Sequence, residues 1–253
     1  MSISVRRWAD LKTTDFGRES DPRIALLPVA AVEQHGPHLP LGTDSYILKA
    51  VLARLGKAPP KNAEILVLPM QMIGDSAEHG NFPGTLSHDA ETLIANWGAI
   101  GGAVAEAGIR KLAIVNSHGG QPQIVDIVAQ RLRAEFQMLA ARINTFLLGV
   151  PDGLFPEDEL AFGFHGGEME TSMMLSLAPE LVDMSAARNF SNLAADLAKK
   201  NKTLRAEGGA SFAWQAQDLN AAGVTGNALA ADAERGALLL DHIAARLGAA
   251  LDD

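Results

Sequence analysis

Histidines and carboxylates concentrate in the turn-rich segments of this sequence. Of the seven histidines, only His242 falls within an amphipathic helical pattern, where a surface or core role is expected. The other six are His35, His38, His79, His88, His118 and His165. A single loop histidine is usually just solvated. Several of them among carboxylates indicate metal binding or acid–base chemistry, because imidazole serves both near neutral pH.

The first of these segments, residues 33–44, follows directly on an apolar run that predicts a buried strand. Glu33 and His35 are two residues apart, so both side chains point the same way in extended backbone. After two prolines the chain returns Asp44 at a predicted helix start. Asp44 could serve only as an N-cap. That alternative leaves Glu33 unexplained, because an unpaired carboxylate at a buried strand end is costly.

A second cluster, residues 116–121, follows the third predicted strand and precedes a helix. It brings His118 to the same edge of the sheet as the first cluster, and Gly119 and Gly120 let backbone approach a ligand closely. A glycine-rich turn of this kind can also cradle phosphate. Because neither a lysine nor a G-x-G-x-x-G pattern accompanies it, nucleotide binding is the weaker interpretation.

The third cluster, residues 165–172, opens a predicted helix with His165 and two carboxylates, Glu168 and Glu170. Residues two apart on a helix cannot share a face. One carboxylate can therefore enter a site while the other caps the helix or pairs elsewhere. The simpler alternative is that both are acidic residues favoured by the helix dipole.

A fourth segment, residues 74–85, supplies candidates for lining a pocket rather than obvious ligands. We expect Ser76, His79 and the Phe82–Pro83 corner to contact a substrate. Trp214 lies in a Gly-rich stretch far along the chain, and we expect it to close the pocket, either in its own subunit or in a neighbouring one.

The elements that must position these residues alternate between strand and helix. This order predicts an α/β fold with a mostly parallel sheet, helices on both faces and ligands at the carboxyl ends of the strands. Apolar runs predict strands at Ile24–Val29, Ile65–Met70, Leu112–Asn116 and Ile143–Val150. Helical spacing predicts helices at Tyr46–Leu55, Ala90–Ala107, Pro122–Phe136, Glu168–Leu177, Leu193–Leu204 and Ala228–Leu251.

Composition narrows the class of protein further. The 253 residues fit one domain, 1–253, and no apolar stretch approaches the ~20 residues of a membrane span. There is no cysteine, which leaves nitrogen and oxygen donors for a metal such as zinc, manganese or iron. A formal charge of -9 disfavours nucleic acid and anionic membranes. The N-terminus lacks a secretory pattern, so a cytoplasmic location is expected.

Together the four segments resemble the creatininase family. The shared patterns are E-x-H-G-x-H-L-P-x-x-T-D, H-x-x-F-P-G-T, N-x-H-G-G and H-x-G-x-x-E-T-S, in the same order over roughly residues 20 to 240. The resemblance implies a three-layer α/β fold, two divalent metal ions per chain and a homohexamer. It also implies that Glu33 and His118 hold one ion, that His35 holds the other and that Asp44 bridges them.

The sequence departs from creatininase itself in its fifth ligand. Creatininase has a glutamate two residues after the metal-binding histidine, and Gly120 stands there in this chain. Relatives that look like this chain use the carboxylate of H-x-G-x-x-E, which implies Glu170, with Glu168 as the alternative. The substrate-binding Tyr and Trp-Asp of creatininase are also replaced, by Gly119 and by residues 160–164. A formamide or another small cyclic or linear amide is therefore at least as good a prediction as creatinine.

These residues predict hydrolysis of an amide C–N bond by a metal-activated water, with His165 protonating the leaving nitrogen. One rival is a metal-binding protein that keeps the site without turnover. Another is a metal-dependent phosphoesterase, which normally uses Arg or Lys to meet the phosphate charge. The four motifs contain no basic residue besides histidine, so the phosphoesterase ranks lower.

Overall fold

The computed structural model describes residues 4–16 and 23–253, which form a parallel sheet covered by helices. The sheet has the order β1-β3-β2-β4-β5, and every neighbouring pair within it is parallel. Its strands are β1 (Val5–Arg7), β2 (Arg23–Val29), β3 (Glu64–Val67), β4 (Lys111–Asn116) and β5 (Leu139–Asn144).

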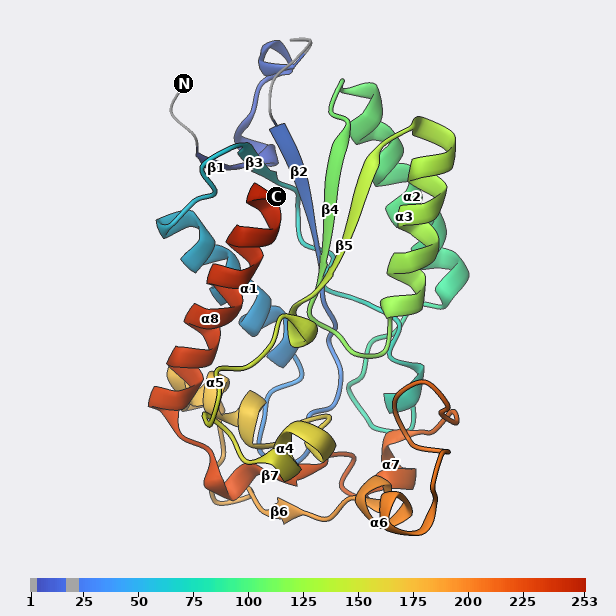
Figure 1. The fold of residues 1–253 in the computed structure, drawn as a ribbon, viewed down its shortest axis with the longest axis vertical. Coiled ribbons are helices and arrows are strands. Elements are labelled where there is room, and N and C mark those ends of the chain that lie inside the picture. The colour runs from blue at the N-terminus through green and yellow to red at the C-terminus, as the bar shows by residue number, and fades with distance from the viewer. Residues whose placement is uncertain (1–3, 17–22) are drawn as a thin grey trace.

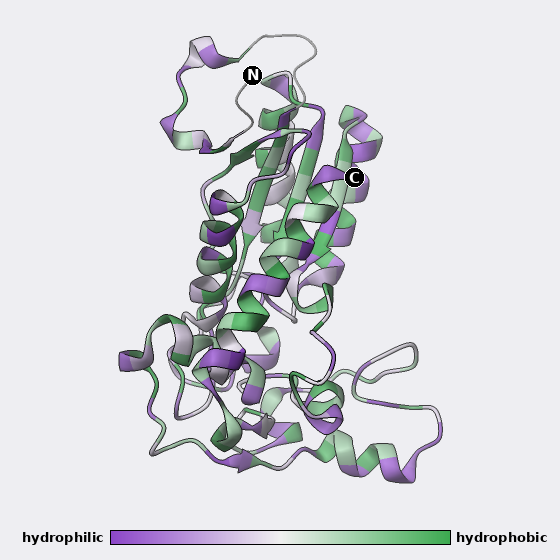
Figure 2. Ribbon diagram, turned by 60° about the vertical axis from the view of Figure 1, so that its left-hand side comes forward, coloured by the Kyte–Doolittle hydropathy of each residue, from purple (hydrophilic) through white to green (hydrophobic). Residues whose placement is uncertain are grey.

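The central strands are buried on both faces, which explains why they read as continuous apolar runs. Side chains alternate along β2, so Leu26 enters the core on one face while Ala25 and Leu27 enter the core on the other. Along β4, Ile114 and Val115 divide between the two cores in the same way. Figure 2 shows hydrophobic residues along these strands.

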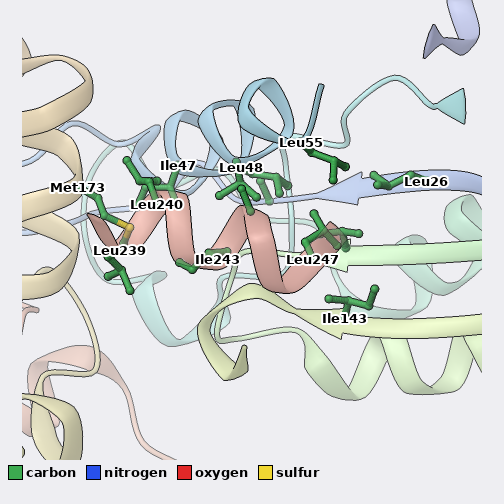
Figure 3. Packing of buried hydrophobic residues seen from close by; sticks show 14 of the residues in the cluster. Leu26, Ile47, Leu48, Leu55, Ile143, Met173, Leu239, Leu240, Ile243 and Leu247 are labelled. Atoms are coloured by element: carbon green, nitrogen blue, oxygen red, sulfur yellow. The ribbon is translucent and has the colours of Figure 1, made fainter. Parts of the chain in front are cut away.

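Helices form the two outer layers, as Figure 1 shows. On one face lie α1 (Thr43–Lys57) and α8 (Ala233–Asp252), with α5 (Glu168–Leu177) packed against α8. On the other face lie α2 (Ala90–Glu106) and α3 (Pro122–Phe136). In the first core, leucines and isoleucines of α1 and α8 meet Leu26 and Ile143 of the sheet (Figure 3). The predicted three-layer α/β fold is confirmed.

The remaining short elements gather at the end of the molecule away from the N-terminus (Figure 1). They are α4 (Glu157–Phe162), α6 (Leu193–Lys200), α7 (Ala216–Leu219) and the antiparallel pair β6 (Asn189–Phe190) and β7 (Gly226–Asn227). Short 3-10 helices lie at Trp8–Asp10, Thr13–Asp15, Ala77–His79, Thr145–Leu147, Pro179–Leu181 and Ala228–Ala230.

The last predicted strand, Ile143–Val150, was misplaced. The observed strand, β5, pairs with β4 from Leu139 and ends at Asn144, opposite the last residue of β4. Beyond that point no neighbour continues the ladder, and the apolar run turns into the 3-10 helix Thr145–Leu147, where Leu147 is exposed. The short elements β1, α4, α7, β6 and β7 were not predicted, because segments of two to six residues carry too little periodicity.

Helix ends also moved for local reasons. The last helix begins at Ala233 rather than Ala228, because the Asp232 side chain accepts a hydrogen bond from the Arg235 backbone N–H and caps it. The helix predicted at Leu193–Leu204 ends at Lys200. Within residues 4–16 and 23–253, no helix combines the length and apolarity needed to cross a membrane.

Candidate metal centre

The adjacent strands β2 and β4 bring the first two clusters together. Val29 and Asn116 are register partners at the ends of these strands, so the segments that follow leave the sheet side by side. The Asn116 side chain then fixes the next turn, accepting a hydrogen bond from the His118 N–H at 3.0 Å and donating one to the His118 carbonyl at 2.8 Å. His118 is thereby held over the carboxyl edge of the sheet.

Asp44 lies between two histidines and does not cap its helix. The N-cap of α1 is Gly42, and the Asp44 side chain is 3% exposed in the first turn. Its Oδ1 lies 3.3 Å from Nε2 of His35, and its Oδ2 lies 3.3 Å from Nδ1 of His118. One carboxylate therefore faces both rings, one through each oxygen.

Glu33 provides a second buried carboxylate on the His118 side. Its Oε1 lies 3.3 Å from Nδ1 of His118, 3.5 Å from Nε2 of His79 and 3.7 Å from Nδ1 of His165. Three histidines from three separate segments of the chain thus converge on this one oxygen.

The two glutamates at the start of α5 point to different partners. Oε1 of Glu170 lies 3.9 Å from Nε2 of His35, and Oε2 accepts a hydrogen bond from the Gly166 N–H at 2.5 Å. Glu168 is buried and forms an ion pair with Arg235 of α8. The geometry favours Glu170 over Glu168 as the carboxylate that completes the centre.

Several buried atoms of this cluster are ready to bind a cation. Among the described residues, Glu33 Oε2, His35 Nε2 and Asp44 Oδ2 are buried without a hydrogen-bond partner, which is costly unless something else binds them. Nitrogen and oxygen ligands suit zinc or manganese. Triads with ligand atoms within 4.8 Å of one another are Glu33–His35–Asp44, Glu33–His79–His165, His35–His165–Glu170 and Glu33–Glu78–His118. The residues therefore fit a metal centre.

Electrostatics within the cluster point the same way. Burial disfavours a charged ring, yet the Asp44 carboxylate 3.3 Å away and the other surrounding carboxylate charges outweigh it and raise the pKa of His35 to about 9. Burial raises the pKa of Glu170 to about 7. Burial and the neighbouring imidazoles lower the pKa of His79 to about 3. The raised pKa values mean that His35, and in part Glu170, hold protons near neutral pH, and a divalent ion would displace these protons.

The predicted catalytic and pocket residues lie at different distances from this centre. His165 stacks against the rings of His35 and His79, with ring centroids 4.1 and 4.2 Å apart, so it belongs to the cluster. Ser76 is buried, with Oγ 3.5 Å from Nε2 of His118. Trp214 packs in a separate apolar cluster, and its Nε1–H donates to the Ala206 carbonyl. Its role as a pocket lid stays a prediction.

The half-buried Phe82 follows the 3-10 helix Ala77–His79, and its N–H donates to the His79 carbonyl at 3.0 Å. A Cβ added at Gly223, which has a φ of +74°, would meet both the Phe82 ring and the Gln34 amide, so these groups are close-packed around one turn. Its contact with substrate stays a prediction.

A family model described as creatininase (creatinine amidohydrolase) matches residues 8–251. This chain belongs to the creatininase family. Among solved structures, creatinine amidohydrolase (creatininase) has a TM-score of 0.74 at 24% identity, covering 96% of this chain and 95% of that one. A zinc–zinc form of a creatininase variant has a TM-score of 0.70 at 25% identity, with 90% and 89% covered.

Curated members of the creatininase family differ in what they act on. The mycofactocin precursor peptide peptidase of Mycolicibacterium smegmatis is 32% identical over 178 residues, 68% of this chain and 65% of that protein. The creatinine amidohydrolase of Pseudomonas putida is 32% identical over 177 residues, 64% of this chain and 66% of that protein. The matched region is therefore about two thirds of these relatives' length.

Glu78 is a residue of the centre that the sequence analysis missed. Its Oε1 lies 3.6 Å from Nε2 of His118 and 3.9 Å from Nε2 of His79, and burial raises its pKa to about 7. A Cβ added at Gly120 would collide with this carboxylate. The glutamate that creatininase itself carries at this position would therefore compete with Glu78 for space. The position of Glu78 directly before His79, in a turn-rich segment, was the signal available in the sequence.

This packing predicts that Gly120→Ala weakens metal binding. The added methyl group would displace the Glu78 carboxylate and crowd Nε2 of His118, which would lie 2.6 Å from it. We expect zinc affinity to fall about tenfold or more, the usual effect of disturbing groups around a ligand. Gly119→Ala is the matched control, because a Cβ there meets nothing within 4 Å. Equal affinities of the two variants in calorimetric titration would contradict the prediction.

Proposed function

We propose that this protein is a metal-dependent amidohydrolase that cleaves the C–N bond of a small cyclic amide or formamide, using two divalent ions per chain. Zinc, manganese and iron are the candidate metals. The observation that carries the proposal is the carboxylate of Asp44, whose two oxygens each lie 3.3 Å from a different buried histidine. That arrangement suits a carboxylate bridging two ions.

The proposed ligands divide between the two sides of Asp44. Glu33 and His118 would hold one ion, and His35 and Glu170 would hold the other. When bound, a metal pair lowers the pKa of water toward ~7 and polarises a carbonyl oxygen, which are the two requirements of amide hydrolysis. Membership of a family that includes a zinc-containing solved structure supports this assignment.

His165 is positioned to move a proton. Its Nε2–H donates to the Gln34 carbonyl at 2.7 Å, so Nδ1 is left bare and faces Oε1 of Glu33. Burial and the nearby His35 charge lower the His165 pKa well below its ordinary value, so the ring is neutral and Nδ1 carries no proton before the reaction. We propose that Nδ1 takes a proton from the attacking water and returns it to the leaving nitrogen.

The alternatives remain distinguishable. Phosphoester hydrolysis would need a cation for the phosphate, whereas the ion pairs at the centre, among the described residues, join histidines to carboxylates. Arg235, which packs near the start of α5, already forms an ion pair with Glu168. Peptide cleavage is represented among the relatives and is included in the test.

The test compares protein loaded with zinc or manganese against chelator-treated protein. Creatinine, small lactams, N-substituted formamides, a short peptide and a phosphomonoester would be screened for ring opening, amine release or phosphate release, as each substrate requires. We expect metal-dependent hydrolysis of at least one small amide. Release from the peptide or the phosphoester alone, or full metal binding with no turnover of any amide, would reject the proposal. The homohexamer, the cytoplasmic location and the single domain stay predictions.

A further inference from the structure

Gln34 contacts two histidines of the centre, His79 through its side-chain amide and His165 through its backbone carbonyl. Backbone groups of other residues determine the orientation of its side-chain amide. Oε1 accepts a hydrogen bond from the Gly36 N–H at 2.8 Å, and Nε2 donates to the Gly223 carbonyl at 2.5 Å. A backbone N–H can only donate and a carbonyl can only accept. The amide oxygen and nitrogen are therefore fixed, and the side chain is 5% exposed.

This orientation fixes the proton on His79. Nε2 of Gln34 carries a second hydrogen, and this nitrogen lies 2.8 Å from Nδ1 of His79. Nδ1 must therefore accept, and the single proton of the neutral ring sits on Nε2. That Nε2–H points into the centre, 3.5 Å from Oε1 of Glu33 and 3.9 Å from Oε1 of Glu78.

The other three histidines of the centre have the opposite arrangement. Each donates one ring N–H to a backbone carbonyl, so its second nitrogen faces the carboxylates. There it can bind a metal ion, which displaces any proton that the nitrogen holds, or accept a proton. The pairs are His35 Nδ1 with the Glu33 carbonyl at 3.1 Å, His118 Nε2 with the Asp75 carbonyl at 2.7 Å and His165 Nε2 with the Gln34 carbonyl at 2.7 Å.

We propose that Gln34 is a positioning residue that keeps His79 as an N–H donor to the carbonyl oxygen of the substrate, and excludes His79 from the metal ligands. Preorganised N–H groups aimed at a developing oxyanion are a large source of rate enhancement in acyl transfer. The backbone carbonyl of Gln34 also accepts the Nε2–H of His165, which leaves Nδ1 of that ring without a proton. The substrate contact rests on the proposed amide hydrolysis, whereas the proton position on His79 does not.

The proton position is measured directly by a long-range ¹H–¹⁵N spectrum of the full chain, labelled at histidine nitrogens and loaded with zinc. Signals of His79 are assigned by their loss in His79→Gln. We expect a protonated Nε2 and a bare Nδ1. A zinc-bound Nε2, or a protonated Nδ1, overturns the proposal whatever the substrate proves to be.

Two amide variants test whether Gln34 is the cause. Gln34→Met keeps the length of the side chain and removes the donor, so we expect His79 to populate both tautomers. Gln121→Met is the matched control: it also removes a buried amide, which donates to Asn116 at 2.9 Å, but it does not touch His79. An unchanged His79 spectrum in Gln34→Met, or the same change in both variants, rejects the positioning role.

A comparison of His79→Gln with His79→Leu distinguishes an N–H donor role of His79 from a metal-ligand role. The Gln amide can place an N–H where the imidazole Nε2–H lies, whereas Leu cannot. We expect both variants to bind two zinc ions with wild-type affinity. We expect kcat on the amide substrate to fall about 100- to 1000-fold in His79→Leu, and about tenfold or less in His79→Gln. Loss of an ion in His79→Leu, or equal loss of kcat in both, overturns the proposal.

Because the spectrum is recorded without substrate, the two proposals fail separately. If no amide is hydrolysed, the proposed function and the substrate contact of His79 are rejected together. The spectrum then still decides whether Gln34 sets the proton of His79.

Discussion

Asp44→Ala is expected to lose both divalent ions and to lower turnover by on the order of a thousandfold or more, because in the proposed centre one bridging carboxylate serves each ion. Each oxygen of Asp44 lies 3.3 Å from a different histidine, so the substitution removes a ligand from both sides at once. Metal analysis of the purified variant gives the number of ions per chain. Circular dichroism establishes that α1 persists, as expected from an N-cap at Gly42.

Asp89→Ala is the matched control for Asp44→Ala. Asp89 is a true N-cap, since its side chain accepts a hydrogen bond from the Thr92 N–H at 2.8 Å at the start of α2. Removing it should cost about 1 kcal/mol of stability and leave the ion content unchanged. If Asp44→Ala behaved in the same way and retained two ions, the bridging assignment would be wrong.

Glu170→Gln is expected to weaken or abolish binding of the ion on the His35 side while the fold survives. The amide keeps the shape of the side chain but removes the charge, and Oε1 of Glu170 lies 3.9 Å from Nε2 of His35. We expect affinity at that site to fall about 10- to 100-fold and turnover to collapse with it. Calorimetric titration with manganese should resolve one tight and one weak site.

Glu168→Gln should affect stability instead of metal binding. Glu168 is buried and paired with Arg235, so removing its charge leaves a partly buried guanidinium without its counter-ion. We expect the free energy of unfolding to fall by up to about 3 kcal/mol, the lower end for breaking a buried pair. Normal two-site binding by Glu170→Gln together with a single site in Glu168→Gln would reverse the assignment of the two glutamates.

Much of the centre was predictable because its spacing is local. Glu33 and His35 are two residues apart after a buried strand, and the backbone geometry of an extended segment places them together whatever the rest of the chain does. Alternation of strands and helices also predicted the sheet edge at which they emerge. The fold class and the creatininase family followed from the same residues, and both are confirmed.

Tertiary packing decided what local spacing left open. Asp44 could have been a helix cap, and only the juxtaposition of β2 and β4 shows its carboxylate between two histidines. The different partners of Glu168 and Glu170 were also left open, because Glu168 pairs with Arg235, which lies on a helix more than sixty residues away. The end of β5 was set by the length of β4, because a strand continues only while a neighbour supplies hydrogen bonds.

The proton positions on His79, His118 and His165 depend on contacts between distant segments. Gln34 and Glu78 carry no periodicity that marks them, and their roles arise from the Gly223 carbonyl and from the space above Gly120. A sequence fixes which groups follow each strand. Which of those groups meet, and which nitrogen of a histidine keeps its proton, depends on side-chain contacts a few ångströms long between residues up to 189 positions apart.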